Sequence, residues 1–215
     1  MKSTVIKVER ICKKINNNII LHDVSLILKS GFIYGFKGKN GSGKTMLMRA
    51  ICGLIKLDTG KIAINGEVLH KDISFPKSIG VLIENPSFLN NLTGYENLKI
   101  LSDLRDKLSE TEIRDTLLAV GLEPYDKRVY RKYSLWMKQK LGIAAAIMGM
   151  PDIVILDEPI NAIDQEGVLL VRQLLNKVKE NGSVVIIACH DREELELLSD
   201  VIIPIEKGRV LNYES

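Results

Sequence analysis

The spacing of hydrophobic and polar positions changes twice along the chain. In the first 85 residues apolar side chains fall in short runs, and Val24, Leu26 and Leu28 alternate with polar residues as in a half-buried strand. From residue 86 to 150 the apolar positions take the wider spacing of helices. Beyond residue 150, unbroken runs such as Ile153–Leu156 indicate strands covered on both faces. The pattern predicts an α/β fold with a mostly parallel sheet and an inserted helical part.

Turn and cap signals separate these segments. Asn65-Gly66 tolerates the positive φ values of a tight hairpin turn, and Ser109 with Glu112 forms a helix-opening capping pair. No internal repeat is present. The predicted strands are Val5–Ile11, Ile19–Leu28, Phe32–Phe36, Ile62–Ile64, Glu67–Leu69, Ile79–Ile83, Ile153–Leu156, Ser183–Cys189 and Val201–Ile205. The predicted helices are Lys44–Leu54, Thr93–Lys107, Ser109–Val120, Ser134–Met148, Gln165–Glu180 and Asp191–Leu198.

Composition narrows the class of protein. A length of 215 residues favours one domain, and a net charge of +3 with Lys and Arg scattered among acids predicts no nucleic-acid partner. Cys12, Cys52 and Cys189 lack the paired spacing of a zinc site or a disulfide framework, so we expect buried thiols in the reducing cytoplasm. No apolar stretch of about 18 residues occurs, so any membrane span has to come from another chain.

A glycine-rich segment follows the third predicted strand and precedes a predicted helix. It matches the phosphate-binding pattern G-x-x-x-x-G-K-[ST], in which glycines let main-chain N–H groups surround phosphate oxygens. Lys44 is expected to neutralise the β- and γ-phosphates of a nucleotide, and Thr45 to bind Mg²⁺. The alternative is a chance glycine-rich turn, which the flanking strand and helix disfavour. The candidate nucleotide-binding residues here are Gly38, Lys39, Asn40, Gly41, Ser42, Gly43, Lys44, Thr45 and Met46.

Two acids end the apolar strand that begins at Ile153. Neighbouring side chains of a strand point in different directions, so Asp157 can face a metal while Glu158 faces the γ-phosphate. Mg²⁺ prefers hard oxygen ligands, which Thr45, Asp157, phosphate and water supply. Glu158 is then expected to polarise the attacking water. The alternative is a solvated Asp-Glu tip on a core strand, which the upstream phosphate-binding loop disfavours.

With these motifs in place, essentially the whole chain resembles the nucleotide-binding domain of ABC (ATP-binding-cassette) transporters. Pro159-Ile160-Asn161-Ala162-Ile163-Asp164 resembles the family's D-loop, with Asn161 and Asp164 as its candidate residues. His190 resembles the switch histidine that contacts the γ-phosphate, although a histidine after a buried strand is often structural. The resemblance implies a P-loop NTPase core with an N-terminal antiparallel β subdomain. Residues 1–85 and 151–215 form the implied core, and residues 86–150 the helical subdomain.

Three positions depart from the family pattern. In the signature segment Ser134-Leu135-Trp136-Met137, Ser134 is kept as a helix N-cap, while Trp136 replaces a glycine and either packs under the subdomain or stacks beside the nucleotide. Glu84 stands where the family carries glutamine, and it remains a candidate catalytic and metal-binding residue. Ile15 occupies the usual position of an aromatic ring that stacks on adenine. These departures favour altered metal affinity and weak base discrimination.

The resemblance also implies partners and a role. Glu84, Asn85-Pro86 and the segments Leu92–Leu98 and Met137–Ala144 are similar to ATPases of lantibiotic- and bacitracin-type self-protection exporters. ATP and Mg²⁺ are the implied cofactors. The implied partners are a separately encoded transmembrane permease and a second cassette, in a head-to-tail homodimer that holds nucleotide between Lys44 and the facing Ser134. The implied location is the inner face of the cell membrane.

Two other functions stay open on the sequence alone. Some ABC ATPases act on ribosomes or DNA, but those relatives usually carry tandem cassettes or long coiled-coil insertions, which this chain lacks. A regulatory nucleotide-sensing module with weak hydrolysis is suggested by Glu84 and Trp136. Measured turnover separates this second alternative from the exporter.

Overall fold

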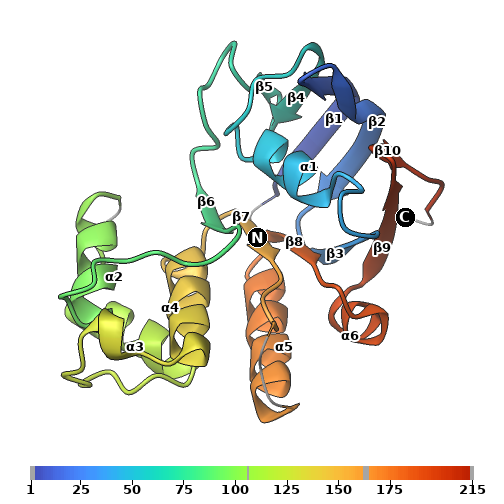
Figure 1. Ribbon diagram of the computed structural model, residues 1–215. Helices are drawn as coiled ribbons and strands as arrows, with labels where there is room; N and C mark the ends of the chain where they lie inside the picture. Colours follow the sequence, from blue (N-terminus) through green and yellow to red (C-terminus); the bar gives the residue numbers. More distant parts are fainter. Residues whose placement is uncertain (1–2, 106, 162–164, 214–215) are drawn as a thin grey trace.

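The computed structural model describes residues 3–105, 107–161 and 165–213. Within these residues, two β-sheets lie side by side with helices packed against them (Figure 1). The N-terminal sheet is antiparallel, in the order β2-β1-β4-β5, and Asn65-Gly66 joins its last two strands with positive φ angles of 51° and 90°. Its strands are β1 (Val5–Ile15), β2 (Asn18–Lys29), β4 (Thr59–Ile64) and β5 (Glu67–Val68).

The second sheet runs in the order β10-β9-β3-β8-β7-β6. All neighbouring strands in it are parallel except β10, which pairs antiparallel at one edge. This topology confirms the predicted α/β fold with a mostly parallel sheet and an antiparallel N-terminal part. The strands are β3 (Phe32–Lys37), β6 (Ile79–Leu82), β7 (Ile153–Asp157), β8 (Val184–Ala188), β9 (Val201–Glu206) and β10 (Arg209–Val210).

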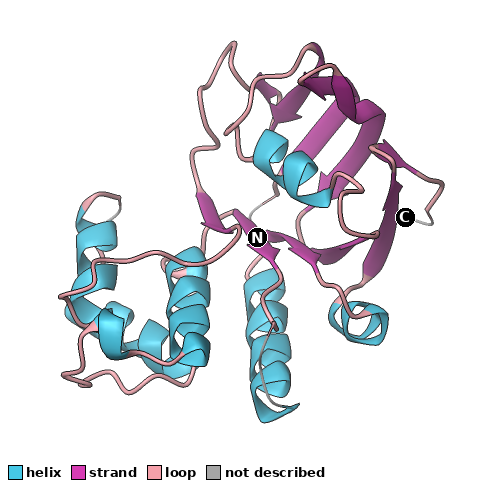
Figure 2. Ribbon diagram, viewed as in Figure 1, coloured by secondary structure: helices cyan, strands magenta, loops and turns pink. Residues whose placement is uncertain are grey.

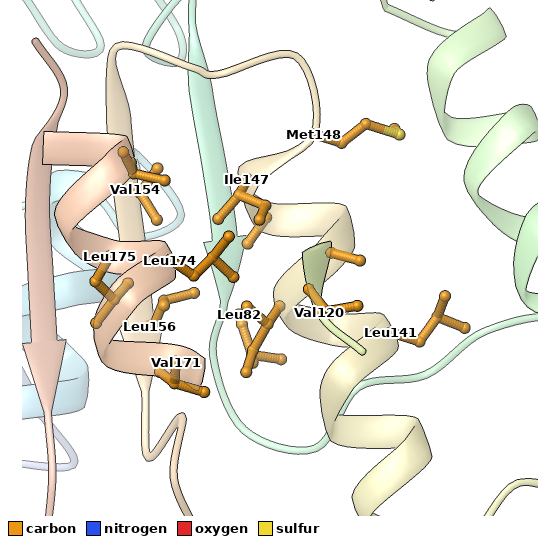
Figure 3. Close-up of a cluster of buried hydrophobic side chains, with 14 of the residues drawn as sticks. Leu82, Val120, Leu141, Ile147, Met148, Val154, Leu156, Val171, Leu174 and Leu175 are labelled. Atoms are coloured by element: carbon orange, nitrogen blue, oxygen red, sulfur yellow. The ribbon is translucent and has the colours of Figure 1, made fainter. Parts of the chain in front are cut away.

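Both faces of the parallel sheet are covered, as the apolar runs predict. Along β7 the side chains alternate, so that Val154 and Leu156 enter one hydrophobic core while Ile155 enters the other. The first core includes α5 (Gln165–Glu180). Figure 3 shows the apolar side chains of α5 next to those of β7 and of neighbouring elements. The second core lies between the two sheets and contains α1 (Lys44–Ile51).

Residues 86–105 and 107–150 fold as a group of helices apart from the antiparallel sheet (Figure 2). These helices are α2 (Gly94–Asp103), α3 (Glu110–Ala119) and α4 (Leu135–Ile147), with a short 3-10 turn before α4. The Ser109 hydroxyl accepts from the N–H of Glu112, and the Glu112 carboxylate accepts from the N–H of Ser109. The predicted capping pair is therefore confirmed as a full capping box. Among the described residues, none of the helices combines the length and the hydrophobicity that a membrane span requires.

Some boundaries differ from the prediction. Helix α1 ends at Ile51 rather than Leu54, because Gly53 takes a left-handed φ of 76° that stops the helix. Strand β10 was not predicted, since two residues carry no periodicity. Helix α6 (Arg192–Leu198) follows β8 as expected. The expectation of buried thiols holds for Cys52 and Cys189, whereas Cys12 is only half-buried, and all three are free.

Candidate functional site

A hollow of about 600 Å³ opens where β3, β7 and β8 end. The carboxyl ends of parallel strands meet at one edge of a sheet, so the loops that follow them are brought together there. The hollow is lined by Asn40, Gly41, Gly43 and the first residues of α1 from the loop after β3. Asp157, Glu158 and Asn161 come from the end of β7, and His190 from the end of β8.

The loop after β3 has the geometry of a phosphate cradle. Gly41 and Gly43 take φ angles of 76° and 109°, and a side chain at Gly41 would meet open space, which leaves the loop backbone accessible. The Lys44 ammonium donates to the main-chain oxygens of Gly38 at 2.6 Å and Lys39 at 3.3 Å, so it is held across the loop. N–H groups at a helix N-terminus beside this ammonium suit a phosphate group.

Not every residue of the predicted motif faces the hollow. Gly38, Lys39 and Ser42 line a separate hollow beside β9. A side chain at Gly38 would approach the main-chain oxygen of Ile205 to 2.3 Å, so that position requires glycine. The Ser42 hydroxyl is buried and has no hydrogen-bond partner among the described residues.

Thr45 and Asp157 meet at the floor of the hollow. The Thr45 hydroxyl donates to Asp157 Oδ2 at 2.6 Å. Two hard oxygens in contact, next to a phosphate cradle, are the kind of ligands that Mg²⁺ uses when phosphate and water complete its shell. The described residues contain no group of three or more His, Cys, Asp and Glu side chains that would hold a metal unaided. The donor set therefore fits Mg²⁺ delivered with a nucleotide.

Glu158 is fixed by contacts from three elements. Its φ of 53° turns the chain out of β7, and its main-chain N–H donates to Ala188 at the end of β8. The main-chain N–H of His190 donates to Glu158 Oε2 at 3.1 Å, and the His190 ring nitrogen Nε2 lies 3.4 Å from Oε1. From α4, the Gln139 side chain donates to the main-chain oxygen of Glu158 at 2.9 Å. The carboxylate is held at the hollow with limited freedom.

The surroundings of the Glu158 carboxyl suit it to act as a general base. Burial raises the pKa of the Glu158 carboxyl, and the nearby Asp157 charge adds to this effect. The N–H and ring of His190, together with Lys44, oppose it by stabilising the charged form. A carboxyl with a raised pKa takes up a proton more readily than an exposed glutamate, which suits the removal of a proton from water.

Comparison with known proteins identifies the family. The protein-family model described as "ABC transporter" matches residues 21–161, more than half of the chain. The chain belongs to the ABC transporter family. As an ABC transporter ATP-binding subunit, it binds ATP and hydrolyses it to power transport. The predicted resemblance is thus confirmed.

Several relatives of this ABC subunit are close in sequence. The uncharacterized ABC transporter ATP-binding protein YybJ of Bacillus subtilis (strain 168) is 46% identical over 210 residues, which are 98% of this chain and 96% of that protein. The bacitracin transport ATP-binding protein BcrA of Enterococcus faecalis is 39% identical, over 96% of this chain and 68% of that protein. The lantibiotic transport ATP-binding protein SrtF of Streptococcus pyogenes is 34% identical, over 96% and 89%.

Solved structures confirm the ABC ATPase fold. An ATP-binding subunit of an ABC transporter superposes with a TM-score of 0.88 at 25% identity, covering 98% of this chain and 90% of that one. The cbiO1 protein of Clostridium perfringens, part of the transporter complex cbiONQ, gives a TM-score of 0.83 at 24% identity, covering 99% and 88%, and supports the fold alone.

The signature segment of this ABC ATPase lies outside the hollow. Ser134 is the N-cap of α4, and its hydroxyl accepts from the N–H of Met137 at 3.1 Å, as predicted. Leu135 is 68% exposed. Trp136 packs partly against the first core, with the Lys140 ammonium 4.8 Å from its ring centre. This contact agrees with the predicted packing of Trp136 under the subdomain, and stacking beside a nucleotide held by a second copy stays a prediction.

Replacement of Trp136 tests whether this bulk matters for turnover. We expect Trp136→Gly to preserve or raise ATPase activity, because the ring lies outside the hollow and glycine restores the small residue of the family pattern. Glycine near a helix start costs up to about 1 kcal/mol of helix stability. Steady-state phosphate release checks the prediction, with thermal unfolding as the control. Loss of ATP-induced dimers in the variant would refute it.

Ile15 does not line the hollow. It ends β1 beside the hairpin to β2 and is 41% exposed, whereas Ile20, in β2, lies in the lining beside Gly43. Strand pairing decided this, and no sequence signal marked Ile20. Asn85 and Gln139 were also missed as lining residues, although both stand within segments quoted for the family resemblance. Asp164 lies outside the described residues, while Asn161 lines the hollow.

The absence of an aromatic ring at both isoleucine positions predicts weak base discrimination. Aliphatic side chains give dispersion contact to either purine but no ring stacking. We expect GTP to support hydrolysis nearly as well as ATP. Parallel kcat/KM measurements with the two nucleotides check this, and strict exclusivity for ATP in a competition assay would count against it.

Proposed function

We propose that this ABC ATPase drives an exporter that removes an antimicrobial peptide or a similar amphiphile. Export of this compound gives the cell that carries the exporter immunity or resistance to it. The observation that carries the proposal is the match to SrtF, a lantibiotic transport ATP-binding protein, over 96% of this chain and 89% of that protein. The match to BcrA, which is named for bacitracin transport, supports the same class of cargo.

The site residues receive the following roles in this proposal. Main-chain N–H groups of the loop and Lys44 bind the triphosphate, which Ile20 flanks on the base side. Thr45, Asp157 and Glu84 hold Mg²⁺, which neutralises phosphate charge when bound. Glu158 accepts a proton from the attacking water, and His190 keeps the Glu158 carboxylate in place and contacts the γ-phosphate.

We further propose how the chain assembles. It forms one nucleotide-binding domain, with a core of residues 1–85 and 151–215 and a helical subdomain of residues 86–150. Two copies sandwich ATP head to tail, so that Ser134 to Met137 of one copy and the D-loop residues Asn161 and Asp164 complete the site of the other. A separately encoded permease holds the pair at the inner face of the cell membrane. The exposed start of α4 at Ser134 supports this arrangement.

Purification from native membranes tests the proposal. We expect the tagged chain to bring down a polytopic membrane protein, and its deletion to increase the killing of cells by a lantibiotic or bacitracin. A Lys44→Ala strain is the matched control, because it keeps the complex while losing ATP binding. Recovery of the chain on ribosomes or DNA, without a membrane protein, would contradict the exporter.

A further inference from the structure

An ion pair links the first helix of the nucleotide site to the residue that replaces the family's glutamine. Arg49 Nη2 lies 2.5 Å from Glu84 Oε1. The Arg49 side chain is 34% exposed and that of Glu84 is 65% exposed. Glu84 lines the nucleotide hollow, whereas Arg49 stands behind it and is not part of the lining. The pair therefore sits at the rim of the hollow.

The backbone conformation places the Arg49 and Glu84 side chains close together. Arg49 follows Thr45 by four residues in α1, so the two side chains lie on the same face of that helix. Glu84 follows β6 with a left-handed φ of 64°, which turns its side chain away from the direction of the strand. A positive φ is uncommon for a non-glycine residue. In this conformation the Glu84 carboxylate contacts Arg49.

We propose that Arg49 is a positioning residue that restrains the Glu84 carboxylate and thereby sets how readily the nucleotide site takes up a divalent cation. The inference rests on the proposed function, in which Glu84 is a ligand of Mg²⁺. A carboxylate oxygen that accepts from a guanidinium is less available to a metal, so the cation and Arg49 compete for Glu84. The pair is largely exposed, so the competition is modest.

Acidic side chains outnumber basic ones in the lining of the hollow. Among the described lining residues, Glu84, Asp157 and Glu158 are acidic. Lys44 is the lysine that lines the hollow with them, and His190 also lies in the lining. A metal-free triphosphate entering this hollow is repelled by each uncompensated carboxylate. Arg49 offsets the charge of Glu84. Removal of Arg49 therefore acts in two opposite directions: metal binding becomes easier, and binding of metal-free nucleotide becomes harder.

Equilibrium binding of a fluorescent ATP analogue, mant-ATP, tests this on the full chain without any need for turnover. We expect Arg49→Met to lower the half-saturating Mg²⁺ concentration by ~2- to 5-fold and to weaken metal-free mant-ATP binding by a similar factor. Arg49→Lys should fall between the wild type and Arg49→Met, because a lysine keeps the charge but loses the planar fork. In a Glu84→Gln background, Arg49→Met should no longer change the half-saturating Mg²⁺ concentration, whereas loss of the guanidinium charge still weakens metal-free mant-ATP binding.

A remote ion pair provides the matched control. Lys77 lies 2.6 Å from Glu67 in an exposed pair away from the hollow, so Lys77→Met removes the same charge without touching the site. We expect Lys77→Met to bind Mg²⁺ and mant-ATP like the wild type. An equal shift in Lys77→Met and Arg49→Met would mean a net-charge effect and would overturn the inference.

The outcomes separate this inference from the proposed function. If the wild type binds mant-ATP without any response to Mg²⁺, both the metal site and the role of Arg49 are wrong. If Mg²⁺ strengthens binding in the wild type and Arg49→Met keeps that dependence unchanged, only the role of Arg49 is wrong. Circular dichroism establishes folding. If Arg49→Met unfolds, Arg49→Lys replaces it, and the effect of Arg49→Lys on the half-saturating Mg²⁺ concentration is compared between the wild-type and Glu84→Gln backgrounds.

Discussion

We expect Glu158→Gln to reduce ATP turnover by at least about 10²-fold while ATP binding stays within a few-fold of the wild type. Glutamine keeps the size of the side chain and can still accept the N–H of His190 through its amide oxygen. It cannot take a proton from water, and that is the chemistry for which the half-buried carboxyl with its raised pKa is suited. Single-turnover phosphate release and mant-ATP binding measure the two effects separately.

Glu180→Gln is the matched control, because Glu180 is exposed at the end of α5 and does not line the hollow. We expect it to retain wild-type turnover. Unchanged phosphate release in Glu158→Gln would remove Glu158 as the base and would also sink the assignment of the hollow as the hydrolytic site. Parallel loss of binding and turnover would instead mean that Glu158 holds the nucleotide.

We expect Gly80→Ala to destabilise the fold by about 3 kcal/mol or more. A Cβ at Gly80 would lie 1.6 Å from the main-chain oxygen of Ala146, so β6 and α4 would have to separate. Backbone atoms cannot rotate away as a side chain can, and the seam between β6 and α4 joins the helical subdomain to the core. Chemical denaturation followed by circular dichroism measures the loss.

Two further variants give this prediction its controls. Gly66→Ala introduces a methyl group into open space at a φ of 90°, so its cost is that of backbone strain, about 1–2 kcal/mol. Ala146→Gly added to Gly80→Ala should not restore stability, because the obstructing atom is the carbonyl oxygen of residue 146 rather than its side chain. Rescue by that second substitution, or a loss in Gly80→Ala no larger than in Gly66→Ala, would contradict the close approach.

The candidate residues reach the edge of the parallel sheet by two routes. The glycine-rich loop, Asp157 and Glu158 follow strands that the apolar runs predict, so their place at one edge of the sheet follows from the parallel arrangement itself. The contact of His190 with Glu158 joins residues 32 positions apart, and β7 and β8 must be neighbours for it to form. The resemblance nominated His190, and the strand order explains its position.

Most elements, their order, the phosphate-binding loop and the acid pair could be predicted, because each depends on periodicity or chemistry within a few consecutive residues. The partners of these residues could not be predicted, because they depend on how the elements pack. The pairing of Arg49 with Glu84, the hold of Gln139 on Glu158, and the presence of Ile20 rather than Ile15 in the lining depend on strand order, register and the seating of α4. Such contacts join segments far apart in the chain, and local patterns carry no information about the packing that brings them together.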